Sequence, residues 1–445
     1  MKKRILAIGL ALTMAIGLTA CGGGNKAESA AKSTSAASEA KEETKEETKE
    51  EAKEETKEEA APSGETTKMT LILRGGTYGE VLEKCLDQFK KDNNVEIEVM
   101  QMSFDDLHTG IALDAQNPTG TYDLCMVDGS WMAEFTENGV LADLGEMGYS
   151  FDDDIIPATT KICINGGKTY LAPYFGNVTV MAYNKALIEA AGYKPEDIDS
   201  FADILDIATK TRESDPKKNG FLIRGGSPDN IVSDFLPHLL VNGGWVVDEN
   251  NNPTVDTPEF RAALEQYLAL YAVGGTLDKD DIVASLDSGE TAMAQIWPGW
   301  YVPQADSAAN YTTIPTKLTD DGKAADAVAL QGVWCVGIPA NAPHKDLALK
   351  LLEYVMDPEV QKSTVEAGGV PCRYSCLLDE KTLETFPHLA TVCGALETGV
   401  YRPAIEEWTE FTSILGTEMD SIIQGQKSID DGLAEAQKQL EKLMG

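Results

Sequence analysis

The chain has 445 residues and a formal net charge of −36, with 73 acidic and 37 basic side chains. No basic stripe is available to neutralise phosphates, which disfavours nucleic acid as a partner. An acidic ligand is disfavoured as well, unless Arg74, Arg224, Arg373 or Arg402 come together in space.

The N-terminus has the pattern of a secretory signal. Lys2, Lys3 and Arg4 precede an uncharged apolar stretch over residues 5–20, which is too short for a comfortable membrane span. The tetrapeptide Leu18-Thr19-Ala20-Cys21 resembles the bacterial lipoprotein cleavage box, in which the cysteine becomes the lipidated first residue. We therefore expect residues 1–20 to be a signal peptide and Cys21 to anchor the protein to the outer face of the bacterial cell membrane. An ordinary signal peptide with a chance cysteine is the alternative.

Residues 21–67 are expected to form a disordered tether that begins at the lipidated cysteine. Residues 41–60 repeat a Lys-Glu-Glu-Thr/Ala unit five times, which places like charges at i,i+4 and leaves no apolar face to bury. Residues 1–67 hold 10 Lys/Arg and 13 Asp/Glu, so a net charge of −33 belongs to the rest of the chain.

The remaining residues, 68–445, are enough for two ordinary domains. Apolar runs with strand character alternate with stretches whose apolar residues recur at helical spacing. The expected strands are 69–73, 95–100 and 122–127, and the expected helices are 80–91, 105–115, 131–138, 185–191, 201–211, 258–273, 344–356, 358–367 and most of 406–443. This alternation predicts an α/β fold with a mostly parallel sheet, whose ligands gather at the carboxyl ends of strands.

Metal, cofactor and catalytic motifs are not found. Seven cysteines follow Cys21 without a C-x-x-C pair, so we expect small buried residues and no metal or cofactor. A calcium-loop spacing begins at Asp248, but Pro253 stands where that loop requires glycine, and a hairpin turn explains the same residues. The four histidines are far apart in the sequence and no nucleophile motif occurs, so no enzyme is predicted.

Several segments together resemble the extracellular solute-binding proteins of bacterial ATP-driven sugar importers, the maltose/trehalose/polyol type of family 1. The matching segments are Tyr122-Asp123-Leu124, Gly139 to Leu144, Gly167 to Tyr174 with Tyr183-Asn184-Lys185, Ser288 to Met293 with Pro298-Gly299-Trp300, Gly332-Val333-Trp334 with Gly337-Ile338, and Ala348 to Tyr354 leading to Pro371. Each segment is weak alone, and their order and spacing carry the resemblance.

The resemblance implies a two-lobed periplasmic-binding-protein-like fold of class II, with the ligand in the cleft between hinge-linked lobes. By position, the N-terminal lobe would hold residues 68–175 and 334–383, and the C-terminal lobe residues 176–333 and 384–445. The hinges would lie at about 176–179 and 331–334. The implied partners are membrane permease subunits with a cytoplasmic ATPase, and we expect a monomer.

Residues that could bind a sugar come first from the tryptophans, because aromatic rings stack on the C–H faces of sugars. Trp300 falls on the stacking tryptophan of the family, Trp297 could line the same wall, and Trp334 lies at the second lobe crossing. All three could instead be packing residues. Asp128 and Trp131 follow an apolar strand at its carboxyl end, where Asp128 could bind hydroxyl groups or cap the next helix.

Five further residues complete the expected ligand-binding set. Tyr174 and Asn177 occupy the crossing strand that faces the cleft in the family, and Tyr78 follows a Gly-Gly turn after the first strand. Asp234 and Arg373 are weaker candidates, together with Trp245 and Trp408.

Three functions compete. A carbohydrate or polyol receptor is the leading prediction, and a receptor for polyamines or other cationic solutes has the same fold. A cleft with tryptophans and few carboxylates favours sugar, whereas several carboxylates around one or two aromatic rings favour an amine. A secreted glycan-active enzyme would need a carboxylate pair roughly 5–10 Å apart across the cleft, and a passive glycan-binding module would lack hinge segments.

Overall fold

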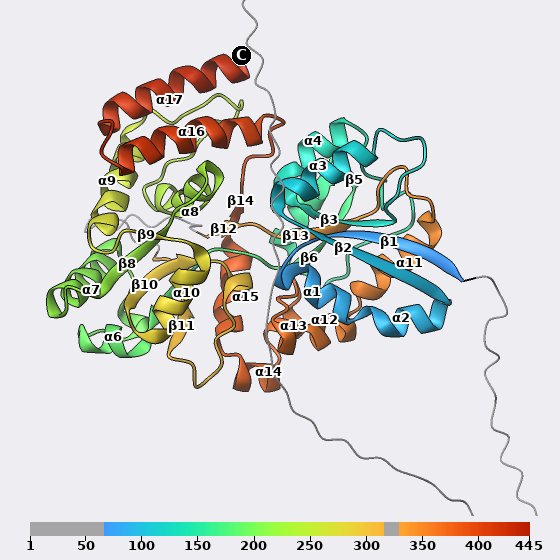
Figure 1. Cartoon of the computed structure of the whole chain (residues 1–445), viewed down its shortest axis with the longest axis horizontal. Coiled ribbons are helices and arrows are strands. Elements are labelled where there is room, and N and C mark those ends of the chain that lie inside the picture. Colours follow the sequence, from blue (N-terminus) through green and yellow to red (C-terminus); the bar gives the residue numbers. More distant parts are fainter. Residues whose placement is uncertain (1–65, 316–328) are drawn as a thin grey trace, which may run out of the picture. The chain divides into compact units, whose positions relative to one another are not determined.

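The computed structural model describes residues 66–315 and 329–445. Residues 62–445 form one compact unit, while the predicted signal peptide, Cys21 and nearly all of the predicted tether lie outside the described residues. The described part contains two five-stranded sheets with helices packed on them (Figure 1). This arrangement confirms the predicted α/β class.

The first sheet has the strand order β2-β1-β3-β13-β6. Its strands are β1 (Thr67–Arg74), β2 (Val95–Met102), β3 (Leu124–Asp128), β6 (Leu171–Phe175) and β13 (Trp334–Gly337). β1 pairs in parallel with β2 and β3, whereas β13 is antiparallel to β3 and β6. Leu71, Ile72 and Leu73 are consecutive and fully buried, as expected for a strand covered on both faces.

The second sheet has the order β11-β7-β10-β8-β9. Its strands are β7 (Val180–Asn184), β8 (Asn219–Arg224), β9 (Thr276–Leu277), β10 (Thr291–Ile296) and β11 (Ala309–Thr312). β8 is parallel to β9 and β10, whereas β7 is antiparallel to β10 and β11. In each sheet four strands run in one direction, as expected of a mostly parallel sheet, and one strand, β13 or β7, runs against them. This strand enters the sheet from the other lobe, so both sheets are mixed.

Helices fill the remaining sequence. They are α1 (Thr77–Lys84), α2 (Leu86–Asn93), α3 (Phe104–Asp114), α4 (Met132–Glu137), α5 (Pro157–Thr160), α6 (Lys185–Ala190), α7 (Phe201–Ser214), α8 (Pro228–Val241), α9 (Pro258–Ala272), α10 (Lys279–Ser288), α11 (Lys345–Val355), α12 (Pro358–Thr364), α13 (Tyr374–Leu377), α14 (Glu380–Thr385), α15 (His388–Thr398), α16 (Trp408–Ile423) and α17 (Ile429–Met444). A small pair, β4 (Ile164–Asn165) and β5 (Lys168–Thr169), lies beside the first sheet.

Two helical features differ from the sequence expectation. The single helix predicted over 80–91 is broken at Cys85, whose backbone N–H binds the carbonyl of Leu82 in a tight i→i−3 bond of 3.2 Å. Helix α8 is not marked by periodicity, because its residues 231–239 are buried without interruption and show no polar face.

Three described segments cross between the two sheets side by side. Residues 176–179 join β6 to β7, and residues 332–333 join β12 (Leu330–Gln331) to β13. The third contains β14 (Val400–Tyr401), which pairs in parallel with β12, while Val178 bridges to Gln331. Figure 1 shows β12 and β14 between the sheets. The first two crossings match the predicted hinge positions, and the third was not expected.

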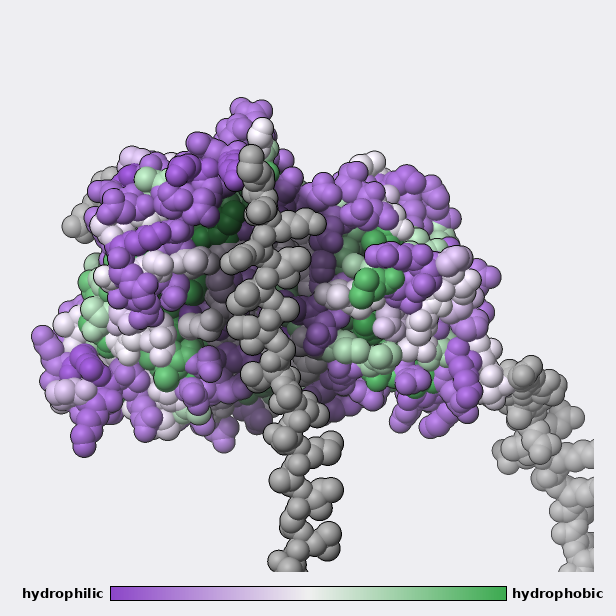
Figure 2. Space-filling view, turned by 45° about the horizontal axis from the view of Figure 1, so that its top comes forward, coloured by the Kyte–Doolittle hydropathy of each residue, from purple (hydrophilic) through white to green (hydrophobic). Residues whose placement is uncertain are grey.

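No helix within residues 66–315 or 329–445 is long and apolar enough to cross a membrane. Two apolar cores underlie the sheets. The face in Figure 2 is mostly hydrophilic, with only small hydrophobic patches, in agreement with the charge of the chain.

Candidate functional site

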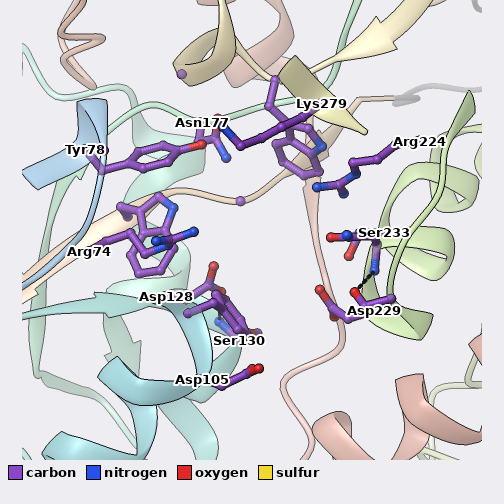
Figure 3. Close-up of a pocket in the computed structure, with 18 of the residues that line it drawn as sticks. Arg74, Tyr78, Asp105, Asp128, Ser130, Asn177, Arg224, Asp229, Ser233 and Lys279 are labelled. Atoms are coloured by element: carbon purple, nitrogen blue, oxygen red, sulfur yellow. Dashed lines mark hydrogen bonds between the residues drawn. The ribbon is translucent and has the colours of Figure 1, made fainter. Parts of the chain in front are cut away.

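A cavity of about 790 Å³ is lined by residues from both sheets and from the crossing segments (Figure 3). It lies at the carboxyl ends of three strands, because Arg74 ends β1, Asp128 ends β3 and Arg224 ends β8, and all three line it. This is where α/β sheets bind their ligands.

Tryptophan dominates the wall of this cavity. All six tryptophans of the chain are described, and five of them line it: Trp131, Trp297, Trp300, Trp334 and Trp408. The rings of Trp131 and Trp334 meet edge to face with centroids 5.8 Å apart, and the Tyr78 ring lies 5.6 Å from Trp334. Flat apolar surfaces of this kind can stack on the rings of a bound sugar.

Two strand ends present arginine to the cavity through the same local sequence. β1 ends Leu-Ile-Leu-Arg-Gly-Gly-Thr, and β8 ends Phe-Leu-Ile-Arg-Gly-Gly-Ser. The second glycine of each turn has a positive φ, 83° at Gly76 and 104° at Gly226, which favours glycine at both positions. Arg74 and Arg224 therefore project from equivalent turns, and Arg402 is a third arginine in the lining.

Arg224 is held rigidly by Asp234. The guanidinium donates from Nε and Nη2 to the two carboxylate oxygens of Asp234 at 2.9 and 2.8 Å, and it lies 4.8 Å from the ring centroid of Trp300. The same carboxylate accepts a hydrogen bond of 2.9 Å from Nε1 of Trp297. Asp234 thus positions an arginine and a tryptophan of the lining without lining the cavity itself.

Asp128 caps a helix and is also placed where it could bind a ligand, so its position is compatible with both roles that the sequence left open. Its carboxylate caps the short 3-10 helix Gly129–Trp131 by accepting from the backbone N–H of Ser130 at 2.9 Å, and it also lines the cavity. Arg402 and the Ser130 hydroxyl donate to the same oxygen at 2.6 and 2.7 Å. The other oxygen of Asp128 has no hydrogen-bond partner among the described residues.

Four polar atoms of the lining are buried and have no hydrogen-bond partner in the described part of the chain. They are Asn177 Oδ1, Ser233 Oγ, Arg402 Nε and Trp408 Nε1. Buried polar groups usually have a partner; these four atoms are closed to solvent here, so a ligand hydroxyl group reaches them only after a side-chain or lobe movement.

Burial sets the protonation of the cavity. It raises the pKa of Tyr78 to about 12, although Arg74 and Arg224 act in the opposite direction, so the phenol stays a hydrogen-bond donor. Burial also raises the pKa of Asp229, against the lowering effects of Arg402 and Arg224. No described group of three or more His, Cys, Asp or Glu side chains is placed to hold a metal ion.

Most of the predicted ligand-binding residues come together here. The cavity is lined by Tyr78, Asp128, Trp131, Asn177, Trp297, Trp300 and Trp334. Trp408, a weaker candidate, lines it too, whereas Trp245 packs against the second core.

The other predicted residues, Tyr174, Asp234 and Arg373, lie outside the lining. Side chains alternate along a strand, so Phe175 packs on Tyr78 with ring centroids 4.9 Å apart, while Tyr174 points into the core beside Cys85. Arg373 is 2% exposed and binds Gln361, Asp152 and the carbonyl of Met356 within the scaffold.

The expected ligand-binding set did not include several lining residues, among them Arg74, Arg224, Asp229, Ser233 and Arg402. The three arginines had been named only as a condition for an acidic ligand, and all three do line the cavity. One signal was available for two of them: the Arg-Gly-Gly sequence repeats after two apolar strands. Asp229 and Ser233 come from the largely buried helix α8, and Arg402 comes from the third crossing segment. Neither segment has a local sequence pattern that predicts a binding site.

The two sheets with their helices form two lobes, joined by crossing segments, and the cavity is lined by both. This is the architecture of a two-lobed ligand-binding protein. The chain belongs to the bacterial extracellular solute-binding protein family, whose model matches residues 75–362, more than half of the chain. It thereby falls in a class of solute-binding proteins, as the resemblance of the segments above implied.

Individual relatives are distant. A probable amino-acid transporter periplasmic-binding protein of Sinorhizobium fredii is 21% identical over 410 residues, covering 85% of this chain and 89% of that protein. The diacetylchitobiose binding protein of Streptomyces coelicolor is 23% identical over 338 residues, covering 72% and 76%. A solute-binding protein of Agrobacterium radiobacter solved with ribitol superposes with a TM-score of 0.74 at 25% identity, covering 85% of this chain and 99% of that one.

Proposed function

We propose that this protein captures a small carbohydrate, either a mono- or oligosaccharide or a polyol, in the cavity between its lobes. It delivers that ligand to the membrane permease of an ATP-driven importer. The observation that carries the proposal is the gathering of five of the six tryptophans around one cavity, beside arginine–carboxylate pairs and unpartnered buried polar atoms.

A carbohydrate fits this lining chemically. Its C–H faces can stack on Trp300 and its neighbours, while its hydroxyl groups can both donate and accept. Asn177 Oδ1 and the second oxygen of Asp128 accept, whereas Arg402 Nε and Trp408 Nε1 donate. The diacetylchitobiose and ribitol named for two of the relatives support the same ligand class.

A polyamine or other cationic solute is the second candidate, and the lining disfavours it. Four basic side chains, Arg74, Arg224, Lys279 and Arg402, line the cavity. A polycation would meet repulsion from them. Five carboxylates also line the cavity, Glu80, Asp105, Asp128, Asp229 and Asp280, but Asp128 and Asp280 are already paired with Arg402 and Lys279. The cavity also has more tryptophans than the one or two aromatic rings expected of an amine site.

The proposal assigns no catalytic role to the chain, in line with its family of binding proteins. The buried carboxylates Asp128 and Asp234 are each engaged by an arginine and by further donors. A general acid needs a carboxyl group that is free to exchange its proton with the substrate, and neither of these two carboxylates is free in this way.

The proposal includes a lipid anchor at Cys21 and a monomeric protein outside the cell. The anchor holds the protein near the permease, and the tether allows the folded lobes to move between the medium and the permease. The family description supports an extracellular location.

A thermal-shift screen of the mature protein against sugars, polyols, polyamines and amino acids tests the ligand class. A ligand present at 100 times its dissociation constant stabilises by about 2.7 kcal/mol, which is readily measured. Stabilisation by a sugar or polyol is the expected result, and stabilisation by polyamines or amino acids alone would overturn the proposal.

A further inference from the structure

The cavity is lined by charges of both signs: five carboxylates, Glu80, Asp105, Asp128, Asp229 and Asp280, and four basic groups, Arg74, Arg224, Lys279 and Arg402. In Figure 3 the labelled basic groups, Arg74, Arg224 and Lys279, lie in the upper part of the view around Tyr78 and Asn177. The labelled carboxylates Asp105, Asp128 and Asp229 lie below them. Lys279 is paired with Asp280 and Arg224 with Asp234, so the guanidinium without a carboxylate in this part of the cavity is the feature that could bind an anion.

Arg74 is the unpaired cation of this part of the cavity. Of the three arginines in the lining, Arg224 and Arg402 each bind a carboxylate, whereas Arg74 has none among the described residues. Its Nη1 donates only to the carbonyls of Gly75 and Met102, at 3.3 and 3.2 Å, and its guanidinium faces the Trp334 ring at 5.9 Å. The remaining N–H groups of Arg74 are free to bind a ligand in the cavity.

Two neutral donors lie beside these basic groups. The Tyr78 phenol lies within the field of both Arg74 and Arg224 and keeps its proton, since burial raises its pKa to about 12. The Asn177 side chain is 6% exposed and its amide oxygen has no partner; its amide can turn to present either atom. Tyr78 also belongs to the first turn of α1, in which the N–H groups of Gly79 and Glu80 donate to the carbonyl of Gly76, the residue before the helix.

We propose that the ligand is an acidic carbohydrate, and that its anionic group is seated between Arg74 and Arg224 beside Tyr78 and Asn177. This inference rests on the proposed carbohydrate-binding function and names the class of sugar. The anionic group can be a carboxylate or a phosphate, because both oxyanions accept charge-assisted hydrogen bonds from guanidinium groups. The hydroxyl groups of the sugar then face the carboxylates in the lower part of the view in Figure 3.

Isothermal titration calorimetry on the mature protein tests the proposal. The probes are glucuronate and galacturonate with their disaccharides, glucose 6-phosphate, and the neutral parents glucose and galactose. We expect an acidic probe to bind at least about tenfold more tightly than its neutral parent. This advantage should shrink as salt is raised from about 20 to about 300 mM. Preference for the uronates or for the phosphate identifies the oxyanion.

Arg74→Gln should lower affinity for the acidic probe about tenfold and change affinity for the neutral parent less than about twofold. Arg74→Lys should retain part of the preference. Arg212→Gln is the matched control, because Arg212 is exposed, also lacks a carboxylate partner among the described residues and lies outside the cavity. It should leave both affinities unchanged.

Equal affinity for acidic and neutral sugars overturns the anionic subsite and leaves the carbohydrate function standing. The same holds for equal losses of both affinities in Arg74→Gln. Binding of a polyamine or amino acid in place of every sugar overturns the proposed function itself. The salt dependence of the unaltered protein tests the subsite even if a variant fails to fold.

Discussion

The guanidinium group of Arg402 donates a hydrogen bond of 2.6 Å to the carboxylate of Asp128, and the side chains are 5% and 4% exposed. Asp128 ends β3 of the first sheet, whereas Arg402 follows β14 on the third crossing segment. The ion pair therefore ties a crossing segment to one lobe at the wall of the cavity.

Removal of one partner should leave a buried charge uncompensated. We expect Asp128→Ala to lower the free energy of unfolding by about 3 kcal/mol, and the double variant with Arg402→Met to recover most of this loss. Urea unfolding of both single variants and the double variant measures the coupling. A double variant no more stable than Asp128→Ala would show that the pair itself does not account for the loss.

Trp300 should supply binding energy without being needed for folding. It is half-buried at the cavity and stacks against the guanidinium of Arg224. We expect Trp300→Ala to weaken carbohydrate binding by about 2 kcal/mol, more than tenfold. Trp245→Ala is the control, since Trp245 lies outside the lining, and it should leave the affinity unchanged in calorimetry. An unchanged affinity in a folded Trp300→Ala protein would place Trp300 on an unused wall.

Local patterns predicted the elements that bury a continuous or periodic apolar face, such as β1 and α9, and failed where burial is complete, as in α8. Cavity residues were predictable where a strand ends, as with Asp128 and Trp131. Arg402 was not, because its place depends on β14 pairing with β12, about 70 residues earlier in the chain.

Tyr174 and Asp234 show a second limit. Neither Tyr174 nor its neighbour Phe175 lines the cavity, and both are buried. The face of the sheet that each residue takes depends on the register of β6 with β13, which is irregular between Trp334 and Cys335. Asp234 was predicted to bind the ligand, but it lies outside the lining and its carboxylate is engaged by Arg224 and Trp297. Sequence identifies a polar residue near a site more readily than it identifies the partner that occupies it.

His238 should make stability depend on pH. It is buried in α8 against Tyr267, and burial lowers its pKa to about 4. An unfolded histidine binds a proton near pH 6.5, so the stabilising effect of the neutral folded form is present above pH 6.5 and is lost as pH falls toward 4. This contribution is of the order of 3 kcal/mol.

Urea unfolding between pH 7 and 4 measures the contribution of His238 to the free energy of unfolding. The fall in stability should be smaller in His238→Gln by that amount, while His388, whose pKa is also about 4, acts equally in both proteins. Parallel pH profiles for the two proteins would contradict the assignment.

Ligand binding should close the lobes. Contacts from both lobes exist together only in a closed form, so a ligand that makes them shifts the population toward closure. We expect the radius of gyration from solution scattering to fall on saturation with the carbohydrate identified by the screen. A constant radius of gyration at saturation would contradict closure.

Membrane attachment should depend on Cys21 alone. We expect Cys21→Ser to release the protein from membranes without a change in ligand affinity, because the anchor contributes nothing to the cavity. Intact-mass measurement of the membrane-bound protein should show acyl chains. Membrane-bound protein without acyl chains would contradict the lipid anchor.

The uneven placement of tryptophan has a spectroscopic consequence. Because five of the six indoles line one cavity, the ultraviolet emission of the whole molecule reports mainly on that cavity, with Trp245 as a constant background. A bound sugar that displaces water from these rings, or a neighbouring guanidinium that shifts against Trp300, would change the emission maximum and its quenching by iodide. The protein thus contains an intrinsic optical sensor of its own occupancy, which can be read without a label.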